Sequence, residues 1–168
     1  MDISILAGYV GLIYSTLTIT PKLYDGLKDI LGPSFEITMN AFIAGIALLL
    51  FAFFYRPTKR KSIMAHLGAL AVVSIFTLLL VYLTPSISEK EHLLEYAFLG
   101  YLALRVFRNA PSRDLAYLYV ALTILIVGYL DEFIQKFLPN RAYELRDVVI
   151  NILSGFLGLV LIMLGKEF

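Results

Sequence analysis

Two segments of the chain carry ionisable side chains at spacings that suit acid–base chemistry. In the first, His92, Glu95 and Tyr96 are three and four residues apart, so they share one face of a helix. In the second, Asp131 and Glu132 are adjacent carboxylates. Neighbouring carboxylates differ in proton affinity, which lets one act as an acid and the other as a base. The catalytic candidates are therefore His92, Glu95, Asp131 and Glu132.

The second segment also carries groups that can bind a polar or anionic ligand. Arg141 can contact a phosphate or a carboxylate through two parallel hydrogen bonds. An internal pairing is the alternative for this arginine. The further substrate-binding candidates are polar residues on the same helices: Gln135, Tyr96, Asp147 and Asn151.

Each candidate also has a structural interpretation. His92 and Glu95 can form an ordinary hydrogen bond within one helix. Metal ligation by these two residues is a less favoured alternative, and we predict no metal and no cofactor. The carboxylates of the second segment can pair with Arg141 and Arg146 and lock the helices together. Asn151 can serve as an interhelical hydrogen-bonding residue.

Composition places these polar residues in or beside a membrane. The chain of 168 residues is 60% hydrophobic and only 16% charged, whereas a soluble domain has about 25% charged residues. A charge in lipid costs at least about 2.5–3.5 kcal/mol on insertion scales, and an interhelical hydrogen bond returns only about 0.6 kcal/mol on average. Stability alone is therefore a weak reason to gather so many ionisable groups.

The apolar residues fall into six long runs separated by polar segments. Runs of this length are typical of transmembrane helices. We predict an all-α integral membrane protein, a bundle of about six transmembrane helices over residues 3–19, 38–55, 63–83, 89–107, 115–137 and 148–164. Residues 21–36 alternate charges with apolar residues at helical spacing, which predicts a short helix on the membrane surface or a loop.

The distribution of Lys and Arg indicates the orientation. Six spans place both termini on one side, and short cytoplasmic loops carry the excess of positive charge. With the N-terminus inside, the cytoplasmic segments carry eight Lys and Arg residues and the outer segments carry six. This favours cytoplasmic termini. It also places both polar segments at the outer face. The predicted location is the cytoplasmic membrane of a prokaryote.

Charge and cysteine content exclude several other classes of protein and site. The net charge is +1, so no basic surface points to nucleic acid. The chain has no cysteine, which excludes disulfides and thiolate metal sites. The length allows one compact helical bundle, and the predicted partner is the lipid bilayer.

Both polar segments resemble the signatures of the VanZ-like membrane proteins. The first reads Glu-Lys-x-His-x-x-Glu-Tyr-x-x-Leu-Gly, from Glu89 to Gly100. The second reads Asp-Glu-x-x-Gln-x-x-x-Pro-x-Arg, from Asp131 to Arg141, and is followed by Asp147, Asn151, Gly155 and Gly158. Many members have Asp-Lys four and three residues before the His, where this chain has Ser88 and Glu89, so a role for that Lys does not carry over.

The resemblance covers roughly residues 63–165 and does not account for residues 3–55. We therefore predict that residues 1–62 are an N-terminal two-span extension and that residues 63–168 are a VanZ-like four-helix membrane core, within one compact unit. The resemblance implies that the candidate residues belong to the shared polar core of the family: His92, Glu95, Tyr96, Asp131, Glu132, Gln135, Arg141, Asp147 and Asn151.

The named member of the family is associated with resistance to teicoplanin. The resemblance thus implies a VanZ-like envelope protein of unestablished activity that lowers susceptibility to glycopeptide or lipoglycopeptide antibiotics. One alternative is a membrane-embedded enzyme acting on a lipid-linked or anionic envelope substrate, with His92, Glu95 and Glu132 as acid–base groups and Arg141 as the anion clamp. A small transporter is the second alternative, although the polar groups gather at one face and not at the midplane. The expected ligands are a lipid-linked cell-wall precursor or a lipoglycopeptide.

Overall fold

The computed structural model describes residues 3–55, 62–84, 86–139, 141 and 143–165. These residues form helices joined by turns, with no strand among them, so the predicted all-α class is confirmed. The basic run 56–61 lies outside the described residues. The helices are α1 (Ile3–Leu31), α2 (Phe35–Phe54), α3 (Ile63–Leu78, continued by a π-helical turn over Leu79–Leu83), α4 (Ile87–Phe107), α5 (Arg113–Gln135) and α6 (Leu145–Gly165).

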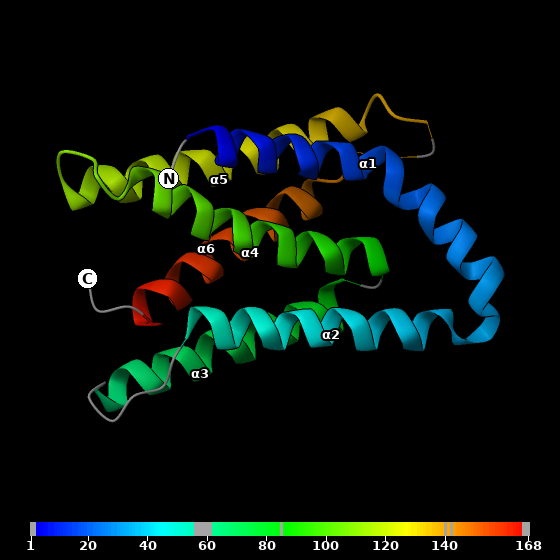
Figure 1. Cartoon of the computed structure of the whole chain (residues 1–168), viewed down its shortest axis with the longest axis horizontal. Coiled ribbons are helices and arrows are strands. Elements are labelled where there is room, and N and C mark those ends of the chain that lie inside the picture. Colours follow the sequence, from blue (N-terminus) through cyan, green and yellow to red (C-terminus); the bar gives the residue numbers. More distant parts are fainter. Residues whose placement is uncertain (1–2, 56–61, 85, 140, 142, 166–168) are drawn as a thin grey trace.

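Successive helices run in opposite directions along the long axis of the bundle (Figure 1). Four helical segments of the described chain are long and apolar enough to cross a membrane: Ile3–Phe54, Ile63–Tyr82, Arg113–Gln135 and Leu145–Leu164. The predicted number of about six spans is not confirmed. One reason is that α1 and α2 form a single helical run through a 3₁₀ turn, Gly32–Ser34. The other is that α4 carries several charged residues and is therefore not among the four segments that are apolar enough to cross a membrane.

The first helix is longer than its apolar run predicts. It continues through Pro21 to Leu31, where we expected a surface helix or a loop. Proline removes one backbone hydrogen bond and commonly bends a helix without ending it, and α1 is bent along its length (Figure 1). Helix α1 ends at Leu31, and the next residue, Gly32, has a φ of 52°, the left-handed conformation that favours glycine after a helix.

Serine residues set the beginning of three helices. The side chains of Ser62, Ser86 and Ser112 accept hydrogen bonds from the backbone N–H groups three residues later, at 3.1–3.2 Å. Such caps satisfy donors that the first turn of a helix leaves free. The cap at Ser86 fixes where α4 begins, and therefore on which turn of the helix its polar residues lie.

Helix α4 occupies the middle of the bundle. It packs most extensively against α6 and α5, and α1 and α2 cover its remaining sides (Figure 1). Small residues allow α4 and α6 to approach closely. A Cβ added at Gly158 would overlap the Ala97 carbonyl oxygen, and one added at Gly100 would lie 2.7 Å from the Gly155 carbonyl oxygen. This contact holds the polar first turns of α4 and α6 side by side.

Candidate functional site

The polar candidates meet at one end of the bundle, where α4 and α6 begin and α5 ends (Figure 1). We call this the polar end. Antiparallel packing of α5 against both neighbours brings its last turns beside their first turns. Several polar side chains are buried there although they come from three helices: His92, Asp131, Glu132, Gln135, Asn151 and Ser154.

At the centre of the polar end, an imidazole lies between two carboxylates. His92 Nδ1 is 3.1 Å from Glu95 Oε2 and 3.8 Å from Asp131 Oδ2. The first contact joins residues three apart on α4, and the second joins α4 to α5. His92 is 9% exposed and Asp131 is fully buried. A protonated imidazole would be stabilised by both carboxylates, so this group can hold and transfer a proton.

Asp131 links the three helices. Asn151 of α6 donates a hydrogen bond from Nδ2 to Asp131 Oδ2 at 3.3 Å. The Tyr96 hydroxyl of α4 donates to the Val127 carbonyl oxygen of α5 at 3.3 Å. We define Glu95, His92, Asp131 and Asn151 as the polar network.

Helix α1 completes the polar network on one side. The Thr16 hydroxyl donates to Glu95 Oε1 at 3.5 Å, and the Tyr9 hydroxyl donates to the Glu95 carbonyl oxygen at 3.0 Å. Sequence reasoning did not select these two residues. Their separation of seven residues places them on one face of α1, and this spacing is a weak signal that could have found them.

Glu132 lies beside the polar network but has different partners. Gln135 donates from Nε2 to Glu132 Oε1 at 2.8 Å, and the backbone N–H of Glu144 donates to Glu132 Oε2 at 3.4 Å. Both carboxylate oxygens are therefore engaged. Glu132 joins the last turn of α5 to the segment that enters α6.

The two predicted counter-charges lie at the rim of the polar end. Arg146 contacts Glu89 at 3.2 Å, Asp147 at 3.1 Å and Glu144 at 3.7 Å. Arg141 donates from Nη2 to Ser88 Oγ at 3.5 Å. Within the described residues, neither arginine forms a salt bridge with Asp131 or Glu132. Ser88 and Glu89, at the departure from the family signature, thus each contact one of the rim arginines.

A pocket of about 710 Å³ opens beside this rim. We call it the basic pocket, because four cationic side chains and two carboxylates line it: Lys22, Lys28, Lys90, Arg141, Asp25 and Glu36. Its lining does not include the polar network. Arg141 is the predicted binding residue that the pocket exposes to a ligand.

The ligand chemistry of the polar end is that of hydrogen bonds and charge. In the described part of the chain, no three His, Asp or Glu side chains are arranged to hold a metal ion. His92 and Glu95, the two residues considered as metal ligands, contact each other directly.

Two polar segments with the spacing of the VanZ-like signatures thus come together in space. Residues 9–166 match the VanZ/LLP1 family. The chain belongs to that family. The match extends beyond residues 63–165, to which the two motifs pointed, and it includes α2 and most of α1. No curated protein and no solved structure matches the chain.

Family membership and the apolar helices identify a VanZ-like membrane protein. Both motifs that carry the VanZ resemblance supply the polar network, the first through His92 and Glu95 and the second through Asp131 and Asn151. The catalytic and binding roles of these residues stay predictions.

Proposed function

We propose that this chain is a VanZ-like protein of the cell envelope that lowers susceptibility to lipoglycopeptide antibiotics through its polar end. The observation that carries the proposal is the position of His92 Nδ1 between Glu95 and Asp131. A buried, ionisable cluster at the end of a membrane bundle is expensive for stability. The side chains of His92 and Glu95 are 11% and 20% exposed, so a polar part of an envelope ligand would reach the cluster through these two residues.

The two histidines of the chain provide a matched test. His92 belongs to the polar network, whereas His66 hydrogen-bonds to Tyr55, outside the network. The chain, His92→Gln and His66→Gln are expressed in a susceptible bacterium, and the minimal inhibitory concentration of teicoplanin is measured. We expect the wild type and His66→Gln to raise it and His92→Gln to leave it at the level of cells without the gene.

Membrane insertion must be measured in the same cells. If His92→Gln is inserted at the normal level and still protects, the polar network is only structural. If the wild-type chain gives no protection against any lipoglycopeptide, the proposed effect on susceptibility is wrong.

The proposal includes the orientation. Six spans with cytoplasmic termini would place the polar end at the outer face. The alternation of helix directions supports repeated crossings (Figure 1), and the distribution of Lys and Arg favours this orientation. The chain lacks cysteine, so single cysteines report accessibility without background. Lys136→Cys, at the polar end, should react with an impermeant maleimide in whole cells, whereas Asn109→Cys, beyond the other end of α5, should react only after lysis. The reverse pattern would show the opposite orientation.

A second candidate function is acid–base catalysis on a lipid-linked or anionic envelope substrate. The specific observation in its favour is that His92 contacts two carboxylates, one on its own helix and one on α5. Asp131 and His92 are then the better acid–base pair, because both oxygens of Glu132 already accept hydrogen bonds. Arg141, which lines the basic pocket, would bind the anionic group.

Catalysis predicts turnover of an envelope lipid in membranes that contain the wild-type chain. Asp131→Asn should abolish that turnover. Glu132→Gln should reduce turnover only indirectly, by displacing the last turn of α5. Turnover that survives Asp131→Asn would exclude this carboxylate as the acid–base group. A transporter would instead move a solute into sealed proteoliposomes, and the position of the polar residues at one end does not favour that function.

A further inference from the structure

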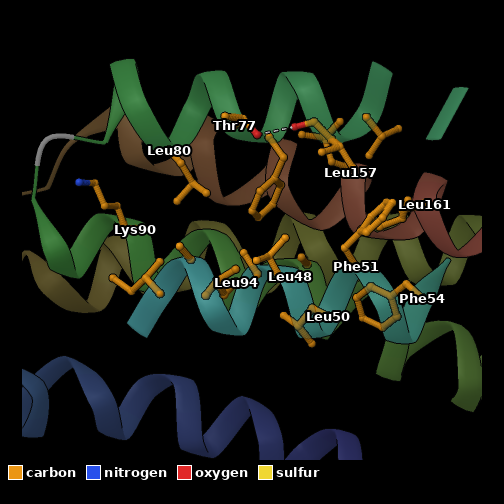
Figure 2. Close-up of a pocket in the computed structure, with 18 of the residues that line it drawn as sticks. Leu48, Leu50, Phe51, Phe54, Thr77, Leu80, Lys90, Leu94, Leu157 and Leu161 are labelled. Carbon is orange, nitrogen blue, oxygen red and sulfur yellow. Dashed lines mark hydrogen bonds between the residues drawn. The ribbon is translucent and has the colours of Figure 1, made fainter. Parts of the chain in front are cut away.

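A second cavity lies on the side of α4 that faces away from α1. It has a volume of about 610 Å³ and runs between α2, α3, α4 and α6 (Figure 2). Its wall is almost entirely aliphatic and aromatic, with Ile43, Phe51, Phe54, Phe76, Leu94 and Leu161 among the lining residues. We call it the apolar groove. Cavities of this size hold drug-sized ligands.

The apolar groove opens sideways, toward the surroundings of the bundle. Helices α2 and α3 pack mainly against α4 and α6 rather than against each other. Leu48 of α2 and Val81 after α3 line the groove and are more than 60% exposed. In a bilayer these exposed faces contact acyl chains, so a lipid can enter the groove directly from the membrane.

One end of the groove is polar. Lys90 lies there, away from Phe51 and Phe54 at the other end (Figure 2). Lys90 Nζ donates a hydrogen bond to Asn40 Oδ1 at 2.8 Å. An ammonium group has three donors, so two remain for another acceptor. Within the described residues, Lys90 forms no salt bridge.

Lys90 and Asn40 also line the basic pocket, so the two cavities meet at this pair. The other cations of the basic pocket are Lys22, Lys28 and Arg141. In the part of the chain that the structure describes, none of these three side chains forms a salt bridge. The apolar groove therefore adjoins a pocket in which four cationic side chains outnumber two carboxylates.

We propose that the two cavities form a binding site for an anionic phospholipid of the surrounding bilayer. One acyl chain occupies the apolar groove, and the phosphate lies beside Lys90, with its headgroup in the basic pocket. The wall of α2 from Asn40 to Phe54 extends for about 21 Å at the rise of an α-helix. One leaflet of the hydrocarbon core is about 15 Å deep, so the groove matches an acyl chain better than a much longer polyprenyl chain.

This site is separate from the polar network, and its test does not depend on antibiotic susceptibility. The full chain contains no tryptophan, so Phe51→Trp introduces a single fluorescent reporter into the groove. The reporter is placed in phosphatidylcholine nanodiscs that contain a minor fraction of phosphatidylglycerol with brominated acyl chains. Brominated phosphatidylcholine at the same fraction is the reference. Phe42→Trp, on the exposed face of α2 outside the groove lining, reports on the bulk lipid.

We expect brominated phosphatidylglycerol to quench the Phe51→Trp variant more strongly than brominated phosphatidylcholine does, and both lipids to quench the Phe42→Trp variant equally. In the Phe51→Trp background, Lys90→Met should lower the apparent affinity for phosphatidylglycerol about fivefold, the effect of one cation near a membrane surface. Lys90→Arg should keep the preference. Lys136→Met, an exposed lysine outside both cavities, should leave it unchanged.

A second pair of variants tests the groove itself. Ala44 lines the groove, whereas Ala52 lies on the same helix outside the lining. Ala44→Phe should abolish the preferential quenching, and Ala52→Phe should not. Equal quenching by the two brominated lipids, or a preference that survives both Lys90→Met and Ala44→Phe, would overturn the proposal. Displacement by a polyprenyl phosphate or by a lipoglycopeptide at lower concentration than by phosphatidylglycerol would overturn the assignment to phospholipid. If Lys90→Met fails to fold, Lys28→Met replaces it.

Discussion

Helix α4 and the helix pair α2–α3 are organised in opposite ways. α4 carries five charged residues, yet most of its side chains are buried or half-buried, including His92 and Tyr96. α2 and α3 together carry only one charged residue in their described helical segments, Glu36, and they expose large apolar side chains such as Leu48 and Leu70. In water this distribution would be reversed. It is the distribution expected of a bundle that is solvated by lipid.

The contrast shows which helices hydropathy can identify. The most apolar helices cover the bundle, because lipid is as apolar as their side chains. Helix α4, which contributes His92 and Glu95 to the polar network, is less apolar, because its polar groups find partners on α1 and α5. In this protein, the helix that fails the criterion for a membrane span is the one that other helices surround.

The largest expected effect comes from placing a charge on the lipid-facing surface of the α2–α3 pair. Leu70, in the middle of α3, is 62% exposed. Leu70→Arg should disfavour membrane insertion by about 3 kcal/mol, the cost of an arginine near the centre of a span. Ile30→Arg is the control, since Ile30 is also exposed but lies near the end of α1. The inserted fraction is measured by glycosylation mapping. Equal insertion of both variants would show that α3 does not face lipid.

A methyl group added between α4 and α6 tests the close packing around the buried helix α4. The Cβ of Gly158→Ala would lie within 3 Å of three backbone atoms of Ala97, and backbone cannot yield as a side chain can. We expect a loss of about 2–3 kcal/mol in the free energy of unfolding. Gly45→Ala, with no atom within 4 Å of the added Cβ, should be neutral or stabilising. Thermal unfolding in detergent measures both, and equal melting temperatures would contradict the close α4–α6 contact.

Sequence periodicity predicted the fold well where a helix is both apolar and uninterrupted. The bounds of α2, α3, α5 and α6 follow from their apolar runs. The extent of α1 could not be predicted, because Pro21 and the following charges are compatible with an end, a loop or a continued helix. Packing decides between these outcomes, since Tyr24 of the continued helix is buried against Phe35 and Met39 of α2.

Local spacing predicted those parts of the candidate site that depend on one helix. The contact between His92 and Glu95 follows from their separation of three residues. The contact between Asp131 and Asn151 required only that α5 and α6 be antiparallel neighbours. The partners of Arg141 could not be predicted, because Ser88 comes from a third helix. Which side chains pair across separate helices depends on distances of a few ångströms. The sequence pattern does not give these distances.

A third variant probes the interior of the polar network. Asp131→Ala removes the acceptor of Asn151 and one of the two carboxylates at His92. Buried polar groups that lose a partner cost about 1–3 kcal/mol, and the free energy of unfolding should fall by that amount. Asp114→Ala, at an exposed position in the first turn of α5, should change it by less than about 0.5 kcal/mol. Equal effects of the two variants on urea unfolding in detergent would show that the polar network is hydrated.

The smallest effect is expected at the rim, where charges are paired but accessible to water. Arg146 is 48% exposed on its side chain, and its contacts are with Glu89, Glu144 and Asp147. Surface ion pairs of this kind contribute about 0–1 kcal/mol. A double-mutant cycle with Arg146→Ala and Glu89→Gln should therefore give a coupling energy below about 1 kcal/mol, and salt should reduce it further. A coupling as large as the loss from Asp131→Ala would mean that rim and interior are equally shielded from water. The contrast between a buried interior and an exposed surface, seen between α4 and the helices α2 and α3, would then be absent at the polar end.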